Sequence, residues 1–234
     1  MNKVNYFLFF CFIYFGINIA NAVNSVDAYE LIYEEREPGT DSYQVKFIVT
    51  EHYLRIDQLG DSSGYVVYDD NQHLVYSVAH NDKSVLVVPE YQYKKPDFTG
   101  AITVDYYIIP DAPTITGKSI YLYRATSSAV DKQKCLDIKL AEGLLPEVSN
   151  ILMSYQKMLA GQQSHLLDAT PKEYQSTCYL YDQVFNDGDY YHKGLPIQEW
   201  HSNGKSRLLL SYKKIKIDPE IFQLEQTYQK YSLD

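Results

Sequence analysis

A series of short strand-forming segments between residues 43 and 88 constrains the fold of this chain more than any other feature. The segments are rich in Val, Ile and Tyr, and clusters of Asn, Asp and Gly separate them. Short β-branched and aromatic runs that are broken in this way are typical of an antiparallel meander. The connections are too short to contain crossover helices, so neighbouring segments should pair as hairpins. The predicted strands are residues 43–50, 53–57, 65–69, 73–80 and 84–88.

Further strands are predicted on both sides of this meander. A strand at 29–36 precedes it, and Asn203-Gly204 in the last quarter of the chain has the two residues favoured at the positive-φ positions of a type I′ hairpin turn. The tail after residue 217 is expected to be extended or to form a short helix. The remaining predicted strands are residues 103–109, 119–124, 178–185, 195–200 and 207–212.

One helix is predicted, over about residues 146–160. Pro146 suits the first helical position, and Gly161 can end the helix. The apolar residues recur at spacings of three and four, which gives the helix a single apolar face. The sequence therefore predicts one domain, residues 23–234, in which a curved antiparallel sheet, or unclosed β-barrel, carries this helix on its concave face. The alternative is a helix that binds a partner protein. The apolar face comprises Leu145, Val148, Ile151, Leu152, Tyr155 and Leu159.

The first 22 residues have the pattern of a secretory signal peptide. Lys3 precedes an apolar run of about a dozen residues, and Ala20 and Ala22 follow it. A retained anchor helix would need roughly 18 or more apolar residues, and Asn18 and Asn21 shorten this run. We expect cleavage after Ala22 and a periplasmic, exported protein that is not an integral membrane protein.

The charge of the mature chain excludes two classes of partner. Cleavage would remove Lys3, leaving 20 basic residues against 30 acidic ones and a net charge of −10. Nucleic acids and anionic membrane surfaces attract proteins through Lys and Arg, so this acidic balance argues against both. Of the 24 tyrosines, 22 remain after cleavage, which suits a sheet with a wet face or a lined concavity.

The two cysteines of the mature chain, Cys135 and Cys178, are predicted to form a disulfide. They lie 43 positions apart in a protein expected in an oxidising compartment. A loop of that size contributes roughly 3–4 kcal/mol through the unfolded state. A catalytic thiol and a metal site are the alternatives, but the chain has neither a Cys-x-x-Cys motif nor a histidine close to either cysteine in sequence.

Several short motifs resemble the LolA/LolB-like superfamily of bacterial envelope proteins and its uncharacterised periplasmic relatives. The similarity extends over most of the mature chain as a pattern of degenerate motifs. It implies an unclosed β-barrel whose helices lie over a hollow, and in several members that hollow holds acyl chains. The motifs are Tyr53-Leu-Arg-Ile-Asp57, Val66-Val-Tyr-Asp69, Leu74-Val-Tyr-Ser-Val78, Gly194-Leu-Pro-Ile197 and Asp218-Pro-Glu-Ile-Phe222, followed by Tyr228.

No motif in the chain indicates catalysis or a cofactor. The sequence contains no Gly-x-Ser-x-Gly and no Gly-rich phosphate loop. The best metal candidate is the set Asp187, Asp189, His192 and His201, but zinc would require three or four of these side chains to converge, and their spacing matches no known site. We therefore expect no metal and no cofactor. A hydrolase whose site is assembled from distant residues is the enzymatic alternative.

The favoured function is non-catalytic binding of a lipid or another amphipathic small molecule. One helix of about 22 Å cannot cover a sheet of eight or more strands, so a partly open cavity is expected between the helix and the meander. An interaction module that docks another envelope protein through an exposed edge or face of the sheet is the second possibility. The alternative to an open cavity is that Tyr side chains and Trp200 fill the space. The expected ligand-binding residues are Val45, Phe47, Val49, Tyr68, Tyr76, Leu152, Tyr155 and Leu159.

Overall fold

The computed structural model describes residues 25–129 and 132–232, and its strands form one twelve-stranded sheet. The order across the sheet is β12-β6-β5-β4-β3-β2-β1-β11-β10-β9-β8-β7. The predicted signal peptide, residues 1–22, lies outside the described residues. The strands are β1 (Val26–Arg36), β2 (Tyr43–Val49), β3 (Tyr53–Gln58), β4 (Gly64–Asp69), β5 (Leu74–Ala79), β6 (Ser84–Pro89), β7 (Ile102–Ile108), β8 (Ile120–Ser127), β9 (Lys134–Glu142), β10 (Gly194–His201), β11 (Ser206–Ile217) and β12 (Gln229–Ser232).

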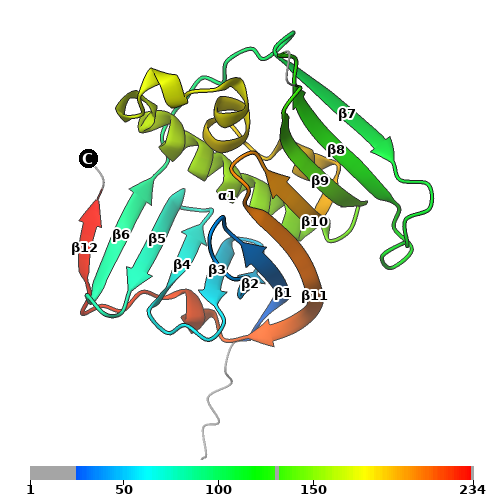
Figure 1. The fold of residues 1–234 in the computed structure, drawn as a ribbon. Helices are drawn as coiled ribbons and strands as arrows, with labels where there is room; N and C mark the ends of the chain where they lie inside the picture. Colours follow the sequence, from blue (N-terminus) through cyan, green and yellow to red (C-terminus); the bar gives the residue numbers. More distant parts are fainter. Residues whose placement is uncertain (1–24, 130–131, 233–234) are drawn as a thin grey trace, which may run out of the picture.

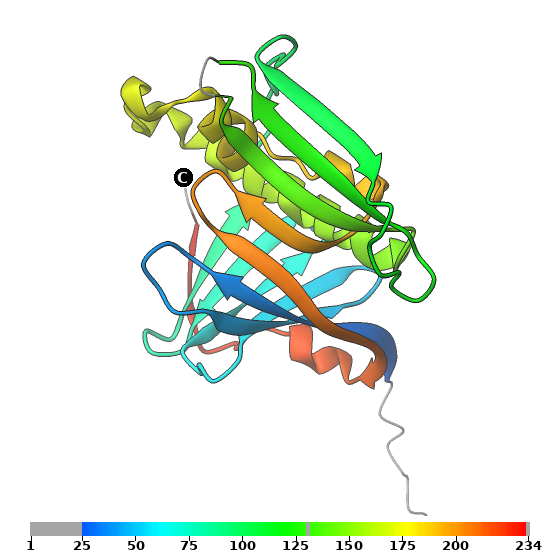
Figure 2. The same cartoon turned by 45° about the vertical axis from the view of Figure 1, so that its right-hand side comes forward.

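The predicted curved antiparallel sheet is confirmed, and it does not close into a barrel. The meander β2–β6 pairs strand by strand as hairpins, while β12 joins β6 as a parallel edge strand. β11 pairs with β1 along its length but with β10 only near its start, and so connects the two halves of the sheet. Irregularities of register in β1–β11, β9–β10 and β8–β9 are of the kind that bends a sheet. The halves β1–β6 and β7–β10 thus lie on either side of α1 (Figures 1 and 2).

The main helix, α1 (Pro146–His165), lies on the concave face as predicted, but it extends beyond the expected end at residue 160 to His165. The helix continues through Gly161, where the lack of a side chain permits close contact with another segment instead of ending the helix. A Cβ atom on residue 161 would lie only 2.6 Å from the carbonyl oxygen of Tyr91. Gly161 therefore allows the segment after β6 to cross the helix at close range, and the Tyr91 ring stacks on His165, with ring centroids 4.2 Å apart.

The C-terminal tail covers the convex face of the meander. It contains the short 3-10 helix η5 (Pro219–Phe222), in which Phe222 stacks on Tyr53. Arg55 donates a hydrogen bond of 2.6 Å to the carbonyl of Ile221, and the Tyr228 hydroxyl lies 2.8 Å from Nδ1 of His80. The sheet consequently has an apolar cluster on each face, and the prediction of an extended or short helical tail is confirmed.

Two sequence predictions for the second half of the chain are wrong. The segment predicted as a strand at 178–185 forms a π-helix, η3 (Tyr179–Val184), and β9 was not predicted. The turn after β10 has a positive φ at Gly204, but Asn203 is not among the described residues with positive φ, so the turn is not type I′. The other short 3-10 helices are η1 (Leu167–Ala169), η2 (Lys172–Tyr174) and η4 (Asp189–His192).

Candidate functional site

Most of the apolar residues expected to line a cavity are packed into the core between α1 and the sheet. The Tyr68 and Tyr155 rings meet with centroids 5.8 Å apart, and Phe47 contacts Tyr33 at 5.0 Å. Side chains therefore fill the centre of the concave face, and any ligand site in this region must lie at its margins. The predicted residues that belong to this core are Val45, Phe47, Val49, Tyr68, Leu152 and Tyr155.

Two of the predicted residues lie elsewhere. Tyr76 was expected on the concave face, but it pairs with Val67 and packs with the convex cluster that Phe222 covers, so this placement is wrong. The alternation of β5 correctly puts Tyr76 and Val78 on one face, but it does not say which face becomes concave. Leu159 is half-buried and lines a polar pocket beside the second half of α1.

A groove of about 570 Å³ lies beside the first half of α1, where the helix meets the ends of β1 and β2. Its lining includes three apolar side chains of the core, Val49, Val148 and Ile151. Asn150 and Ser154 extend from the same helix into the lining. The groove therefore has apolar side chains at its inner end and polar groups around its mouth. It is an opening at the margin of the predicted hollow.

The mouth of the groove is acidic. Asp27, Glu51, Asp70 and Glu147 line it together with one cation, Lys214. Asp27 is paired with Lys214 at 3.0 Å and with Lys216 at 2.8 Å, and hydrogen bonds to these lysines hold the pKa of Asp27 below its usual value. Within the described residues, none of the other three carboxylates has an ion-pair partner. The groove consequently favours a ligand that offers positive charge or hydrogen-bond donors.

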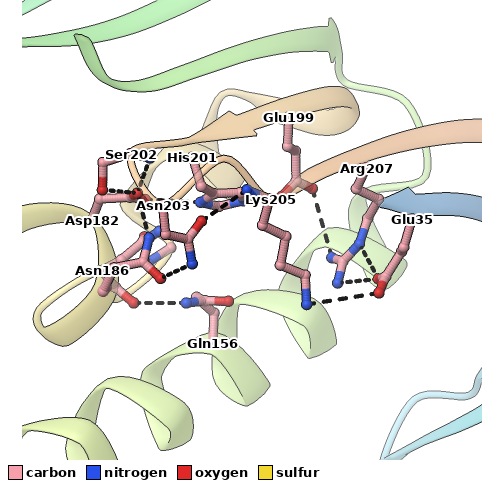
Figure 3. Close-up of polar contacts among 12 residues, drawn as sticks. Glu35, Gln156, Asp182, Asn186, Glu199, His201, Ser202, Asn203, Lys205 and Arg207 are labelled. Carbon is pink, nitrogen blue, oxygen red and sulfur yellow. Dashed lines mark hydrogen bonds and ion pairs between the residues drawn. The ribbon is translucent and has the colours of Figure 1, made fainter. Parts of the chain in front are cut away.

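A network of buried charges occupies the opposite end of the concave face (Figure 3). Asp182 of η3 has a fully buried side chain and accepts hydrogen bonds from the backbone N–H (2.6 Å) and the hydroxyl (2.8 Å) of Ser202. Its other oxygen lies 2.8 Å from Nδ1 of His201, while Nε2 of His201 lies 3.3 Å from Glu199. These contacts fasten η3 to the end of the β10–β11 hairpin.

Arg207 continues the network toward β1. Its guanidinium lies 2.6 Å from Glu35 and 3.7 Å from Glu199. Lys205 lies 3.7 Å from Glu35 and 3.3 Å from Glu37 at the exposed end. Asp182, Glu199 and Glu35 therefore face three groups that can be cationic, namely His201, Arg207 and Lys205. The balance keeps three buried carboxylates compensated, as burial of charge requires.

The network sets the protonation of its members. Burial lowers the pKa of His201, but its hydrogen bonds with Asp182 and Glu199 outweigh this effect and raise the pKa to about 9. Burial raises the pKa of Glu199, yet Arg207 and His201 bring it below its ordinary value. Glu35 behaves in the same way because Arg207 and Lys205 are close. At neutral pH the network therefore contains an imidazolium and ionised carboxylates.

A polar pocket of about 400 Å³ opens beside this network. Gln156 of α1 donates to the backbone carbonyl of Asn186 at 3.0 Å, and Asn203 donates to Gln183 at 2.8 Å. Among the described residues, none accepts a hydrogen bond from the buried Nδ2 of Asn186. The pocket is suited to a small polar molecule. Next to the pocket, the hydroxyl of Ser202 donates to Asp182.

The predicted metal candidate does not assemble. Asp187 and Asp189 pair with Lys95 at 2.6 and 3.6 Å, whereas His201 belongs to the charge network. Within residues 25–129 and 132–232, no three His, Cys, Asp or Glu side chains converge as a metal site would require. The helices described in those ranges are also too short or too polar to span a membrane.

The predicted disulfide between Cys135 and Cys178 is present. It joins β9 to the residue immediately before η3, and both cysteines are buried. The bond thereby holds the segment that carries Asp182 against the sheet, and it supports the formation of the charge network.

Comparisons with known proteins give distant structural likenesses. No family model and no curated protein matches the chain. An uncharacterised conserved protein from Thermus thermophilus is 6% identical, with a TM-score of 0.41 over 90% of this chain and 92% of that one. PNGF-II is 12% identical, with a TM-score of 0.40 over 89% of this chain and 31% of that one. A LolA superfamily protein, NE2245 from Nitrosomonas europaea, is 10% identical, with a TM-score of 0.33 over 87% and 91%. At these values the likenesses assign neither a family nor a function.

Proposed function

We propose that this protein is an exported, non-catalytic binding protein that takes an amphipathic small molecule in the groove beside α1. The observation that carries the proposal is the composition of the groove. Val49, Val148 and Ile151 are buried side chains of the core that close the inner end, while carboxylates surround the mouth. An apolar site with a few fixed polar groups is the usual form of a small-molecule site, since the apolar part supplies affinity and the polar groups orient the ligand.

The ligand should be smaller and less anionic than an acyl chain with a carboxylate head. Tyr68, Tyr155 and Phe47 already fill the centre of the concave face, so a long chain has no continuous path there. Glu51, Asp70 and Glu147 have no ion-pair partner among the described residues, and their charges would repel an anionic head group. A short apolar chain or ring that carries an ammonium group fits both constraints.

The buried disulfide supports export, because such bonds persist in oxidising compartments. The charge network supports a non-catalytic role, since its ionised groups are paired with one another and the hydroxyl of its serine donates to Asp182. Docking of another envelope protein is a different function, because it needs an exposed apolar patch, whereas binding in the groove involves only a small ligand.

The test is a binding titration with two fluorescent probes that share a short butyl chain, one ending in an ammonium group and one in a carboxylate. The ammonium probe should bind saturably and the carboxylate probe more weakly. Replacing the exposed Asn150 with Trp should fill the mouth and weaken ammonium binding by about tenfold or more. Lys157→Trp, at an exposed position of the same helix that does not line the groove, is the matched control.

A charge variant separates the polar contribution from the apolar one. Glu51 is exposed and has no ion-pair partner among the described residues, so Glu51→Gln should leave the fold intact. It should weaken binding of the ammonium probe and leave the carboxylate probe unchanged or improved. Equal binding of both probes by the wild type and by Asn150→Trp would show that the groove is not the site.

A further inference from the structure

Within the described residues, no strand pairs with the outer edge of β7. β7 is the last strand of the sheet, and Figure 2 shows it as the outermost strand of its half. Its register with β8 is continuous from Ile102 to Ile108, without a bulge, and the strand contains no Pro, Lys or Arg. Soluble proteins normally protect such edges with prolines, bulges or inserted charges. Only Asp105 provides a charge here. The opposite end of the sheet is different, because the short β12 caps β6 there.

Apolar side chains accompany the free backbone groups on this strand. Val104, Tyr107 and Ile108 are each nearly half exposed, at 46%, 48% and 46%. Large apolar side chains so exposed on neighbouring positions of one edge are unfavourable in an isolated monomer. The edge is therefore suited to pairing with another strand, which would satisfy the backbone groups and cover these side chains together.

The hydrogen bonds to β8 show which residues of β7 are free to pair. The N–H of Ile109 donates to the carbonyl of Ile120, and the N–H of Ser128 donates to the carbonyl of Ala101. Hydrogen-bonded pairs alternate along an antiparallel ladder, so the odd-numbered residues of β7 bond to β8. Val104, Tyr106 and Ile108 consequently direct their N–H and C=O groups outward, whereas the N–H of Ile102 donates to the carbonyl of Phe98.

We propose that this edge binds the same edge of a second copy of the chain, in an antiparallel register with Tyr106 opposite Tyr106. This register uses the outward-facing residues of both copies and places Val104 of each opposite Ile108 of the other. It also places Asp105 opposite Tyr107, whose hydroxyl can donate to the carboxylate. A shift that instead centres the pair on residue 105 would put the two Asp105 side chains opposite each other, which is unfavourable. Pro110, with no N–H, ends the ladder.

The self-complementary order of the strand is what selects a second copy over another partner. Val104 meets Ile108, Tyr106 meets the Tyr106 of the second copy, the carboxylate of Asp105 meets the hydroxyl of Tyr107, and a two-fold axis through Tyr106 closes the pair. The contact is a single strand from each copy, so it belongs to the small, weak class of interfaces. The resulting dimer would extend the sheet across two molecules and leave the groove beside α1 in each copy unaffected.

Sedimentation velocity over concentrations from about 1 to about 200 µM, the range appropriate to a small interface, tests the proposal. The wild type should pass from monomer to dimer. Val104→Lys should weaken dimerisation by about tenfold or more, and Ile108→Lys should do the same if the first variant does not fold. Leu210→Lys, at an apolar position on β11 with a similar exposure of 44%, should dimerise like the wild type. A wild type that stays monomeric, or a dimer that Val104→Lys and Leu210→Lys affect equally, would overturn the proposal.

Oxidative cross-linking tests the register. In an antiparallel hydrogen-bonded pair the Cα atoms lie about 5.5 Å apart, within the range that a disulfide spans. Tyr106→Cys should therefore yield a covalent dimer, whereas Asp105→Cys should not, since residue 105 faces residue 107. The native cysteines are buried in their own disulfide and should not interfere. Cross-linking through residue 105 but not 106 would contradict the proposed pairing.

Discussion

The stability of this protein should decrease as the pH rises from 6 to 9, and His201 should be responsible. The pKa of His201 is raised to about 9 in the folded protein by Asp182 and Glu199, against about 6.5 for an unperturbed histidine. A group whose folded-state pKa is raised stabilises the fold fully below its unfolded pKa and loses that effect as the pH passes through the folded pKa. The relevant window is therefore pH 6.5 to 9.

The magnitude follows from the difference between the two pKa values. It corresponds to about 3 kcal/mol in the free energy of unfolding, of which about 2 kcal/mol should be lost between pH 6 and pH 8. The side chain of His201 is only 16% exposed, so solvent screens the interaction little. Below pH 5 the stability should instead decrease as the pH falls. The pKa values of Glu35 and Glu199 are lowered in the folded protein, so their stabilising effect is lost when they become protonated.

Urea unfolding at a series of pH values measures this effect. His201→Gln keeps a polar side chain of similar reach but cannot become an imidazolium. It should destabilise the protein by about 3 kcal/mol at pH 6 and much less at pH 9, which flattens the profile. His192→Gln, at an exposed position, should retain the wild-type profile. If the curves of stability against pH for the wild type and His201→Gln ran parallel from pH 6 to 9, His201 would not be the group whose protonation stabilises the fold.

Three further predictions concern the covalent and backbone features of the chain. Cys135→Ser should lower the free energy of unfolding by about 2–5 kcal/mol, and alkylation of two thiols in the native, unreduced protein would contradict the disulfide. Gly161→Ala should cost about 1–3 kcal/mol in urea unfolding, because its Cβ would collide with the Tyr91 carbonyl; a neutral result would mean that the crossing segment yields easily. The mass of exported protein should correspond to a chain that begins at Val23, and material that still contains Met1 would refute cleavage after Ala22.

The local features of the fold could be predicted from the sequence because they depend on near neighbours in the chain. Alternating β-branched and aromatic residues between turn clusters specify the hairpins of β2–β6, and Pro146 with its periodic apolar residues specifies the start and the inner face of α1. The end of α1 could not be predicted, because the need for Gly161 arises from Tyr91, which lies seventy positions earlier. The strand predicted at 178–185 fails for a similar reason: Asp182 is satisfied by His201 and Ser202, and Cys178 is bonded to β9.

The sequence by itself determined which residues are apolar, where strands and turns alternate, and that Cys135 and Cys178 could pair. Only the tertiary structure decided which side of each strand faces α1, since alternation defines two faces without saying which becomes concave; Tyr76 therefore lies under the C-terminal tail instead of in a hollow. It also decided the charge network, because the pairing of β11 with β1 brings Arg207 beside Glu35, 172 positions earlier in the chain, and the contact of η3 with the β10–β11 hairpin brings Asp182 beside His201. Such sites depend on contacts between elements that are distant in the sequence, and no local sequence pattern indicates those contacts.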